Sequence, residues 1–293
     1  ERFMDKKVAL QIRNFEPISR AAKAMKSAGF KYVAFAFTDK NLLLCSDWER
    51  KVYEIAEIFD KYSLKCIQTH APFYPLLVSA EERDEGLEKS ILRSVEATKI
   101  LGADLLAVHP RSVIKEDETA EVLTEKSLKE NIISFNGVVN LCEKLGITLG
   151  IENLMEDEQR PPCFYSCKAE DHAELIDKMN SKFVKAIWDF GHANIVNADH
   201  AERIKILGNR IVGTHVHQND GKEDNHYPPA IPPSNAYFVK RTVDWNNVLK
   251  TLKSTGYDGY LTLETMPSWQ HCAESYIRYL YDSVCELDDI LRK

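Results

Sequence analysis

Leu145-Gly146-Ile147-Thr148-Leu149-Gly150-Ile151-Glu152-Asn153 is the stretch of sequence that decides the fold class. A helical pattern over 120–145 stops at Gly146, and glycine can adopt the left-handed conformation that ends a helix. A short run of aliphatic and β-branched residues follows at once and closes with the carboxylate of Glu152. The order of helix, glycine and buried strand is typical of a fold built from repeated strand-and-helix units.

The same order recurs along the whole chain. Glycine also separates a helical pattern from a strand pattern at Gly29, Gly102 and Gly256. The predicted strands are 8–12, 32–37, 65–70, 104–109, 148–153, 184–189, 211–217 and 260–264. The predicted helices are 18–28, 48–62, 82–101, 120–145, 169–179, 201–207, 245–254 and 273–291.

Eight strands that alternate with eight helices in 293 residues predict an α/β protein, a (β/α)8 TIM barrel with 1–293 as a single domain. A doubly wound open sheet is the alternative. Its glycine-rich fingerprint is missing after the first strand, where Gln11-Ile12-Arg13-Asn14 stands instead. The barrel is therefore the preferred interpretation.

Composition and charge exclude some classes of protein and disfavour others. Hydrophobic residues make up 44% of the chain and charged residues 28%, as in soluble globular domains. A net charge of -7 disfavours nucleic acid and anionic membranes as partners, and no apolar run is long enough to span a bilayer. The seven cysteines form no zinc-knuckle pattern and indicate reduced thiols. We therefore expect a cytoplasmic protein.

Potential metal ligands stand at the carboxyl ends of six successive predicted strands. Catalytic residues of a barrel collect at this end, because its strand-to-helix loops converge there. The six residues are His70, His109, Glu152, Asp189, His217 and Glu264. Burying three carboxylates together is costly unless a cation compensates their charge, so we predict a bound divalent metal ion.

Further ionisable residues surround this ring. His192 follows Asp189 by three residues, a spacing that turns both side chains toward one site if the strand ends at Asp189. His215 and His217 are two residues apart and share one face of a strand, so periodicity does not decide which of them faces the metal. Two more candidates occupy the loop after that strand, where they are either site residues or ordinary solvated ones: Asp224 and His226.

Six motifs, in order along almost the whole chain, resemble those of the xylose isomerase-like barrels. They are Thr69-His70-Ala71-Pro72, Val108-His109-Pro110, Ile151-Glu152-Asn153, Trp188-Asp189-Phe190-Gly191-His192, His215-Val216-His217-Gln218-Asn219-Asp220 and Leu263-Glu264. This superfamily contains sugar isomerases and epimerases together with the endonuclease IV class of apurinic endonucleases. The segments 189–195 and 243–260 are similar to the sugar branch.

The resemblance implies a set of ligands and of substrate contacts. The implied ligands of a central metal are Glu152, Asp189, His217 and Glu264. His217 is preferred to His215, because the family pattern runs His, two residues, then Asp. In the sugar enzymes the implied substrate-binding residues are His192, His70, His109 and His226. In the endonuclease branch the implied ligands of additional zinc ions are His70, His109, His192, Asp224 and His226.

The function that this resemblance implies is a sugar or sugar phosphate isomerase or epimerase. Such an enzyme abstracts a proton next to a carbonyl through a metal-stabilised enediolate, with Glu152 and Glu264 removing and returning the proton from opposite sides. Aromatic residues within 227–237 are expected to cover the sugar. The ligands permit Mn, Co, Mg or Zn, and recruitment of His70 and His109 favours zinc. A homo-oligomer is compatible with such a barrel.

The alternative function is that of an endonuclease IV-like zinc phosphodiesterase acting at abasic sites in DNA. This activity needs a basic groove for the DNA backbone. Only Arg111, Lys115 and Arg160 stand plainly in the loops of the active face. The charge pattern therefore favours a small sugar as the substrate.

Overall fold

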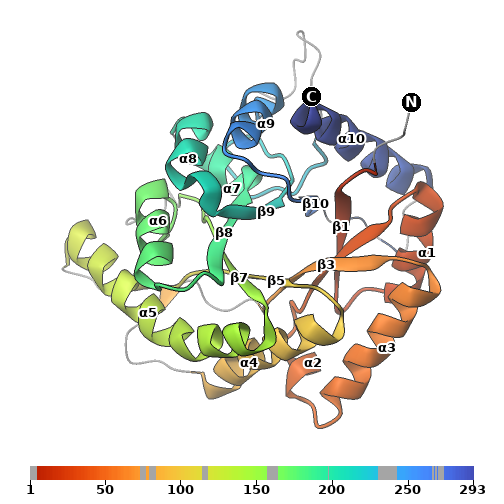
Figure 1. The fold of residues 1–293 in the computed structure, drawn as a ribbon, viewed down its shortest axis with the longest axis horizontal. Coiled ribbons are helices and arrows are strands. Elements are labelled where there is room, and N and C mark those ends of the chain that lie inside the picture. The colour runs from red at the N-terminus through yellow and green to blue at the C-terminus, as the bar shows by residue number, and fades with distance from the viewer. Residues whose placement is uncertain are drawn as a thin grey trace.

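The computed structural model describes residues 5–72, 77–78, 84–113, 118–156, 164–196, 198–229, 243–265, 267, 269 and 274–293. Within them, eight parallel strands form a barrel with helices on its outside (Figure 1). The barrel strands are β1 (Val8–Arg13), β2 (Tyr32–Ala36), β3 (Lys65–His70), β5 (Leu105–Val108), β7 (Thr148–Glu152), β8 (Val184–Asp189), β9 (Ile211–His215) and β10 (Leu261–Leu263). The predicted (β/α)8 barrel is confirmed.

The two ends of the sheet meet and nearly close the barrel. The strand order is β10-β1-β2-β3-β5-β7-β8-β9, with parallel pairing throughout. A parallel bridge between Val216 and Leu263 joins the remaining edges, and the Val216 amide donates to the Thr262 carbonyl at 2.7 Å. Because all the strands run in one direction, their carboxyl ends surround one mouth of the barrel.

Helices cover the outer faces of the strands, as predicted. They are α1 (Ile18–Ala28), α3 (Trp48–Lys61), α4 (Glu85–Ile100), α5 (Ala120–Leu145), α6 (Ala169–Lys178), α8 (His200–Leu207), α9 (Trp245–Ser254) and α10 (Glu274–Arg292). The predicted glycine stops are present, since Gly29 and Gly146 cap α1 and α5 at φ values of 111° and 69°. These left-handed conformations strain any residue with a Cβ atom.

Short elements that have no sequence periodicity were not predicted. They are α2 (Asn41–Leu44), α7 (Phe190–Ile195), the 3-10 turn Gly208–Arg210, and a two-stranded parallel sheet of β4 (Leu77–Val78) and β6 (Ser112–Val113). Helix α7 bears on the site, because it begins directly after β8. The carboxylate of Asp189 accepts a hydrogen bond from the His192 amide at 2.6 Å and so caps this helix. The cap turns the chain sharply at the mouth of the barrel.

Two glycines make room for the side-chain layer beneath the strand ends. Gly150 and Gly213 stand two residues before Glu152 and His215 and therefore share their inward faces. A Cβ atom at either glycine would lie 2.6 Å from the side chain of Ile187. The side chain of Ile187 thus occupies the space beside the two glycines.

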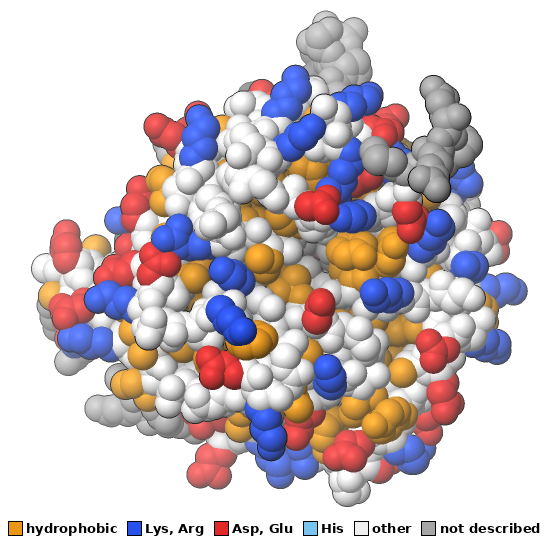
Figure 2. All heavy atoms as spheres, in the orientation of Figure 1, with side chains coloured by type: hydrophobic (Ala, Val, Ile, Leu, Met, Phe, Trp, Pro, Cys, Tyr) orange, Lys and Arg blue, Asp and Glu red, His pale blue; other side chains and the backbone are white. Residues whose placement is uncertain are grey.

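Several sequence expectations concern the surface and the thiols. None of the described helices has the length and apolar character that crossing a membrane requires. In the described part of the chain, Cys45, Cys66, Cys142, Cys167 and Cys285 are free. On the face that Figure 2 shows, basic side chains alternate with acidic ones, and neither sign forms a continuous area. This face offers no extended basic surface for a polyanion.

His172 is expected to make stability depend on pH. Its side chain on α6 is fully buried and donates from Nε2 to the Ile151 carbonyl at 2.8 Å. Burial lowers its pKa from 6.5 to about 4. The unfolded chain therefore takes up this proton at a higher pH than the folded protein does. Between about pH 6.5 and pH 4 the free energy of unfolding should fall by about 3 kcal/mol from this group.

Urea unfolding between about pH 7 and pH 4 tests this expectation, with His172→Gln as the comparison. Gln keeps an amide donor for the Ile151 carbonyl but does not titrate. The wild type should lose more stability than the variant across this range. Parallel losses in the two proteins would contradict the assignment.

Candidate metal centre

The mouth of the barrel brings together the histidine, aspartate and glutamate residues that the sequence nominated as ligands or substrate contacts. His70 ends β3, Glu152 ends β7, Asp189 ends β8, and Glu264 directly follows β10. The other members are His109 after β5, His192 in α7, His215 at the end of β9, and His217, Asp224 and His226 in the loop after it. Apart from His109, each belongs to at least one group whose ligand atoms lie within 4.8 Å of one another. His109 joins them through Glu152, at 3.3 Å.

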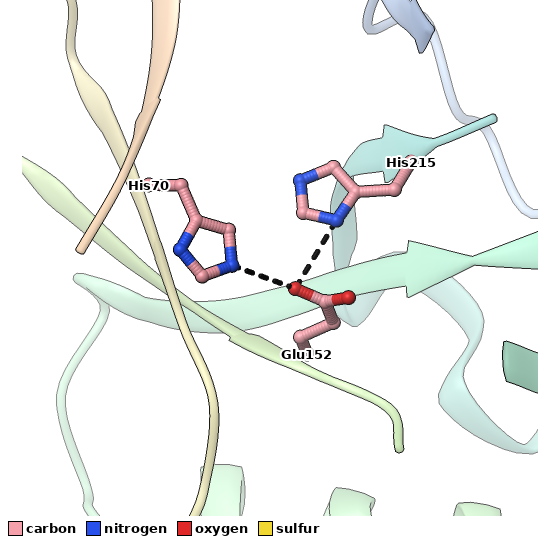
Figure 3. Close-up of side chains that lie close together, drawn as sticks. All are labelled: His70, Glu152 and His215. Carbon is pink, nitrogen blue, oxygen red and sulfur yellow. Dashed lines mark hydrogen bonds and ion pairs between the residues drawn. The ribbon is translucent and has the colours of Figure 1, made fainter. Parts of the chain in front are cut away.

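Glu152 lies in the middle of four imidazoles. Its Oε2 atom is 3.2 Å from His70 Nε2 and 3.1 Å from His215 Nδ1, and both rings point at it (Figure 3). The same oxygen faces His109 Nε2 at 3.3 Å, and Oε1 faces His192 Nδ1 at 3.1 Å. Burial disfavours the charged carboxylate, but the imidazoles outweigh burial and hold the pKa of Glu152 well below its usual range. Glu152 is therefore an ionised carboxylate, buried at the mouth of the barrel.

His215 points one nitrogen into a group of three carboxylates. Its Nδ1 atom is 3.1 Å from Glu152, 3.4 Å from Glu264 and 3.7 Å from Asp189. This nitrogen is buried, and apart from these ion-pair contacts it has no hydrogen-bond partner among the described residues. Burial disfavours a charged His215, yet the carboxylates raise its pKa to about 10. Several anionic oxygens thus converge where an imidazole nitrogen also points, which is the donor set of a cation site.

A second group of imidazoles surrounds Asp224. The nearest approaches of the Asp224 carboxylate are 3.3 Å to His226 Nε2, 3.5 Å to His192 Nε2 and 3.9 Å to His217 Nε2. The rings of His217 and His226 stack in parallel, with centroids 4.0 Å apart. Burial raises the pKa of Asp224, but His192 and the other imidazoles outweigh burial and hold it far below its usual range. We call His192, His217, Asp224 and His226 the Asp224 group.

Backbone carbonyls fix the orientation of three histidines. His70 donates from Nδ1 to the Ala71 carbonyl at 2.7 Å, and His192 donates from Nδ1 to the Asn153 carbonyl at 2.9 Å. His226 makes the same bond to the Glu264 carbonyl. A carbonyl only accepts, so each of these bonds uses the hydrogen on Nδ1, and Nε2 is the nitrogen left to face the site. Metal-binding histidines commonly have this arrangement.

The structure separates the two histidines that sequence periodicity left equivalent. His215 Nδ1 belongs to the group formed with Glu152, Asp189 and Glu264. His217, which the resemblance placed in that position, has its Nε2 atom 3.0 Å from Asp189 and belongs to the Asp224 group as well. Gly191 makes this placement possible, because a Cβ atom there would lie 1.9 Å from His217 Cε1.

Sequence reasoning missed the amide side chains that support the carboxylates. Gln11 on β1 donates from Nε2 to Glu264 Oε1 at 2.7 Å. Gln68 on β3 contacts His215 Nε2 at 2.8 Å. Asn153 bridges two strand ends, since its Oδ1 accepts from the Asp189 amide at 2.7 Å. The available signal was a polar residue at a buried position of an otherwise apolar strand.

Some expectations for the surrounding loops fall outside the described residues. These are Lys115, Arg160, positions 157–163 of the first long loop, and positions 230–237 of the expected cover over the sugar. Arg111 is described, and its guanidinium is buried 3.8 Å from Glu130 on α5. Its side chain therefore lies against a helix.

A family model described as xylose isomerase-like TIM barrel matches residues 22–280. The chain belongs to this family. Two proteins of Methanocaldococcus jannaschii are similar in sequence. MJ1311 is 28% identical over a region that covers 73% of this chain and 69% of MJ1311. MJ1614 is 29% identical over a region that covers 76% of this chain and 77% of MJ1614.

Solved structures share the xylose isomerase-like fold at low sequence identity. A D-tagatose 3-epimerase-like protein has a TM-score of 0.70 at 20% identity, covering 97% of this chain and 98% of its own. A 3-keto-D-glucoside 4-epimerase from E. coli has a TM-score of 0.69 at 19% identity, covering 97% and 99%. The IolI protein with a bound zinc atom has a TM-score of 0.67 at 17% identity, covering 96% and 98%. These likenesses establish the fold.

Proposed function

We propose that the protein is a divalent-metal-dependent isomerase or epimerase of a sugar or sugar phosphate. The observation that supports this function best is the His215 Nδ1 atom, buried without a hydrogen bond beside the carboxylates of Glu152, Asp189 and Glu264. Ionised carboxylates do not gather in a buried site without compensating positive charge. The names of the solved relatives, several of them sugar epimerases, agree with this class of reaction.

The donor set fits a divalent metal ion. Glu152, Asp189, His215 and Glu264 would hold it, with His217 as the alternative imidazole ligand that the family pattern favours. Three carboxylates and one imidazole suit Mn, Co or Mg, and zinc is also compatible. Such an ion polarises a carbonyl and its neighbouring hydroxyl and stabilises negative charge that develops on them.

Glu152 and Glu264 are the acid and base that we propose. Both carboxylates lie against His215 Nδ1, at 3.1 and 3.4 Å, and they come from strands on different sides of the barrel. One removes the proton next to the substrate carbonyl and the other returns a proton from the opposite face, as inversion of a carbon requires. Gln11 fixes Glu264 by donating to Oε1 at 2.7 Å. The fixed carboxylate spends no energy on reorientation during proton transfer.

Histidines around the carboxylates are the proposed substrate contacts. His70, His192 and His226 present Nε2 toward the site with their Nδ1 hydrogens bonded to carbonyls, so Nε2 is the atom that would form hydrogen bonds with sugar hydroxyls. His109 lies beside them. A small sugar, whose hydroxyls both donate and accept, fits these closely spaced imidazoles. A homo-oligomer is compatible with the exposed helices of the barrel.

A second candidate function is hydrolysis of a phosphodiester at abasic sites by several zinc ions. The Asp224 group favours it, because imidazole nitrogens gathered around a carboxylate suit zinc. His70 and His109, which share the Glu152 Oε2 atom, would complete such a cluster. The net charge of -7 disfavours a polyanionic substrate and makes this the weaker candidate.

Direct assays separate the two functions. Protein loaded with Mn, Co, Mg or Zn is incubated in deuterated water with free and phosphorylated ketoses, and in parallel with a duplex containing one abasic site. We expect a new sugar epimer or isomer with deuterium at the carbon next to the carbonyl. Strand cleavage without sugar conversion would instead identify the phosphodiesterase. Inactivity on both, at full metal occupancy, would contradict the proposed function.

A further inference from the structure

Gln68 lies directly behind the imidazole of His215. Its amide Nε2 atom is 2.8 Å from His215 Nε2, and it is 1% exposed. His215 has no exposed surface, and its other nitrogen faces Glu152 and the neighbouring carboxylates. One edge of the ring is therefore held by Gln68 while the opposite edge faces the proposed metal position.

The layer beneath the site leaves room for the Gln68 amide. A Cβ atom at Gly213 would lie 2.9 Å from Gln68 Oε1, so the missing side chain creates this space. A cavity of about 220 Å³ lies beneath, lined by both residues. The amide can consequently turn over without moving the strands around it.

The Gln68 amide lies within hydrogen-bond distance of His215 Nε2, so it fixes the edge of the ring that faces away from the carboxylates. An imidazole binds a cation through the lone pair of one nitrogen, and its other nitrogen then donates to an acceptor. The Gln68 amide oxygen is the acceptor that this arrangement needs, because the amide has one donor end and one acceptor end.

We propose that Gln68 is a positioning residue: its amide oxygen accepts the Nε2 hydrogen of His215 and thereby leaves the Nδ1 lone pair to the divalent cation. This inference rests on the proposed metal centre. It assigns to Gln68 no contact with the substrate or with the reacting atoms.

Metal affinity tests the inference without an activity assay. Mn²⁺ and Zn²⁺ are titrated calorimetrically into metal-free wild type, Gln68→Met, Gln68→Glu, His215→Ala and the double variant Gln68→Met/His215→Ala. Met preserves the length of Gln without its hydrogen bonds, whereas Glu keeps an acceptor for His215. We expect Gln68→Met to weaken binding about 10- to 100-fold and Gln68→Glu to stay within about threefold of wild type. In the His215→Ala background, Gln68→Met should change affinity by less than about threefold.

The outcomes distinguish this inference from the proposed function. A wild type that binds neither ion overturns the metal centre and the inference with it. Tight binding by wild type and equally tight binding by Gln68→Met overturns the inference alone. An equal loss for Gln68→Met with and without His215 shows a general packing role and also overturns it. Circular dichroism of each variant verifies that the barrel has folded.

Discussion

Replacing Glu152 by Gln should abolish tight metal binding and lower kcat/KM for the sugar at least about 10³-fold. Gln has nearly the shape of Glu, so the packing around it is preserved. It lacks the negative charge that the imidazoles of His70, His192 and His215 surround at 3.1 to 3.2 Å. It also cannot take up a proton as a base. A single change therefore removes a ligand and one of the two proposed acid-base groups.

Calorimetric metal titration and steady-state kinetics measure the two effects separately. Glu125→Gln is the matched control, because Glu125 on α5 is exposed and pairs with Lys129 at 2.6 Å. The control should bind metal and turn over substrate as the wild type does. Loss of turnover with metal affinity intact would restrict Glu152 to acid-base chemistry. Turnover within tenfold of wild type would refute both roles.

Replacing Gly191 by Ala should destabilise the protein by about 3 kcal/mol and remove most of its activity. The new Cβ atom would lie 1.9 Å from His217 Cε1 and 2.5 Å from His217 Nε2. His217 cannot easily move aside, because the ring of His226 stacks on it with centroids 4.0 Å apart. The clash therefore displaces either α7, which begins with the Asp189 cap, or the imidazoles of the Asp224 group.

Urea unfolding and the sugar assay test this expectation, with Gly137→Ala as the control variant. Gly137 lies within α5 and a Cβ atom there meets no other atom within 4 Å, so that substitution should stabilise the helix by about 0.5 to 1 kcal/mol. If contact with His217 causes the loss, Gly191→Ala should cost much less stability in a His217→Ala background. If Gly191→Ala lowers the free energy of unfolding just as much in the His217→Ala background, the methyl group clashes with the backbone of α7 and not with the imidazole.

Most of the architecture could be predicted from local sequence patterns. Buried runs such as 148–153 and helices ended by glycine, such as 120–145 before Gly146, depend on neighbours within a few residues. Few folds other than the barrel are built by repeating this unit of one strand and one helix. Helix α7 was not predicted, because a helix of six residues is too short to show helical periodicity and because its start depends on a side-chain cap.

The sequence predicted which residues form the candidate site, but not how their side chains are arranged. Residues at the carboxyl ends of parallel strands must share one mouth of a barrel, so the chain order of His70, Glu152, Asp189 and Glu264 was enough to nominate them. Strand periodicity places His215 and His217 on one face and cannot rank them. Their different surroundings come from β3, β7 and α7, which lie far away in the sequence.

The pattern of side chains along the chain therefore specified a barrel and the residue types at its mouth, because both follow from short-range periodicity and strand direction. Which imidazole nitrogen faces which carboxylate depended on the folded chain. Contacts such as Gln68 with His215, and the space at Gly191 that admits His217, join segments separated by long stretches of sequence. Such contacts exist only after the strands have paired and the barrel has closed, so no local pattern encodes them.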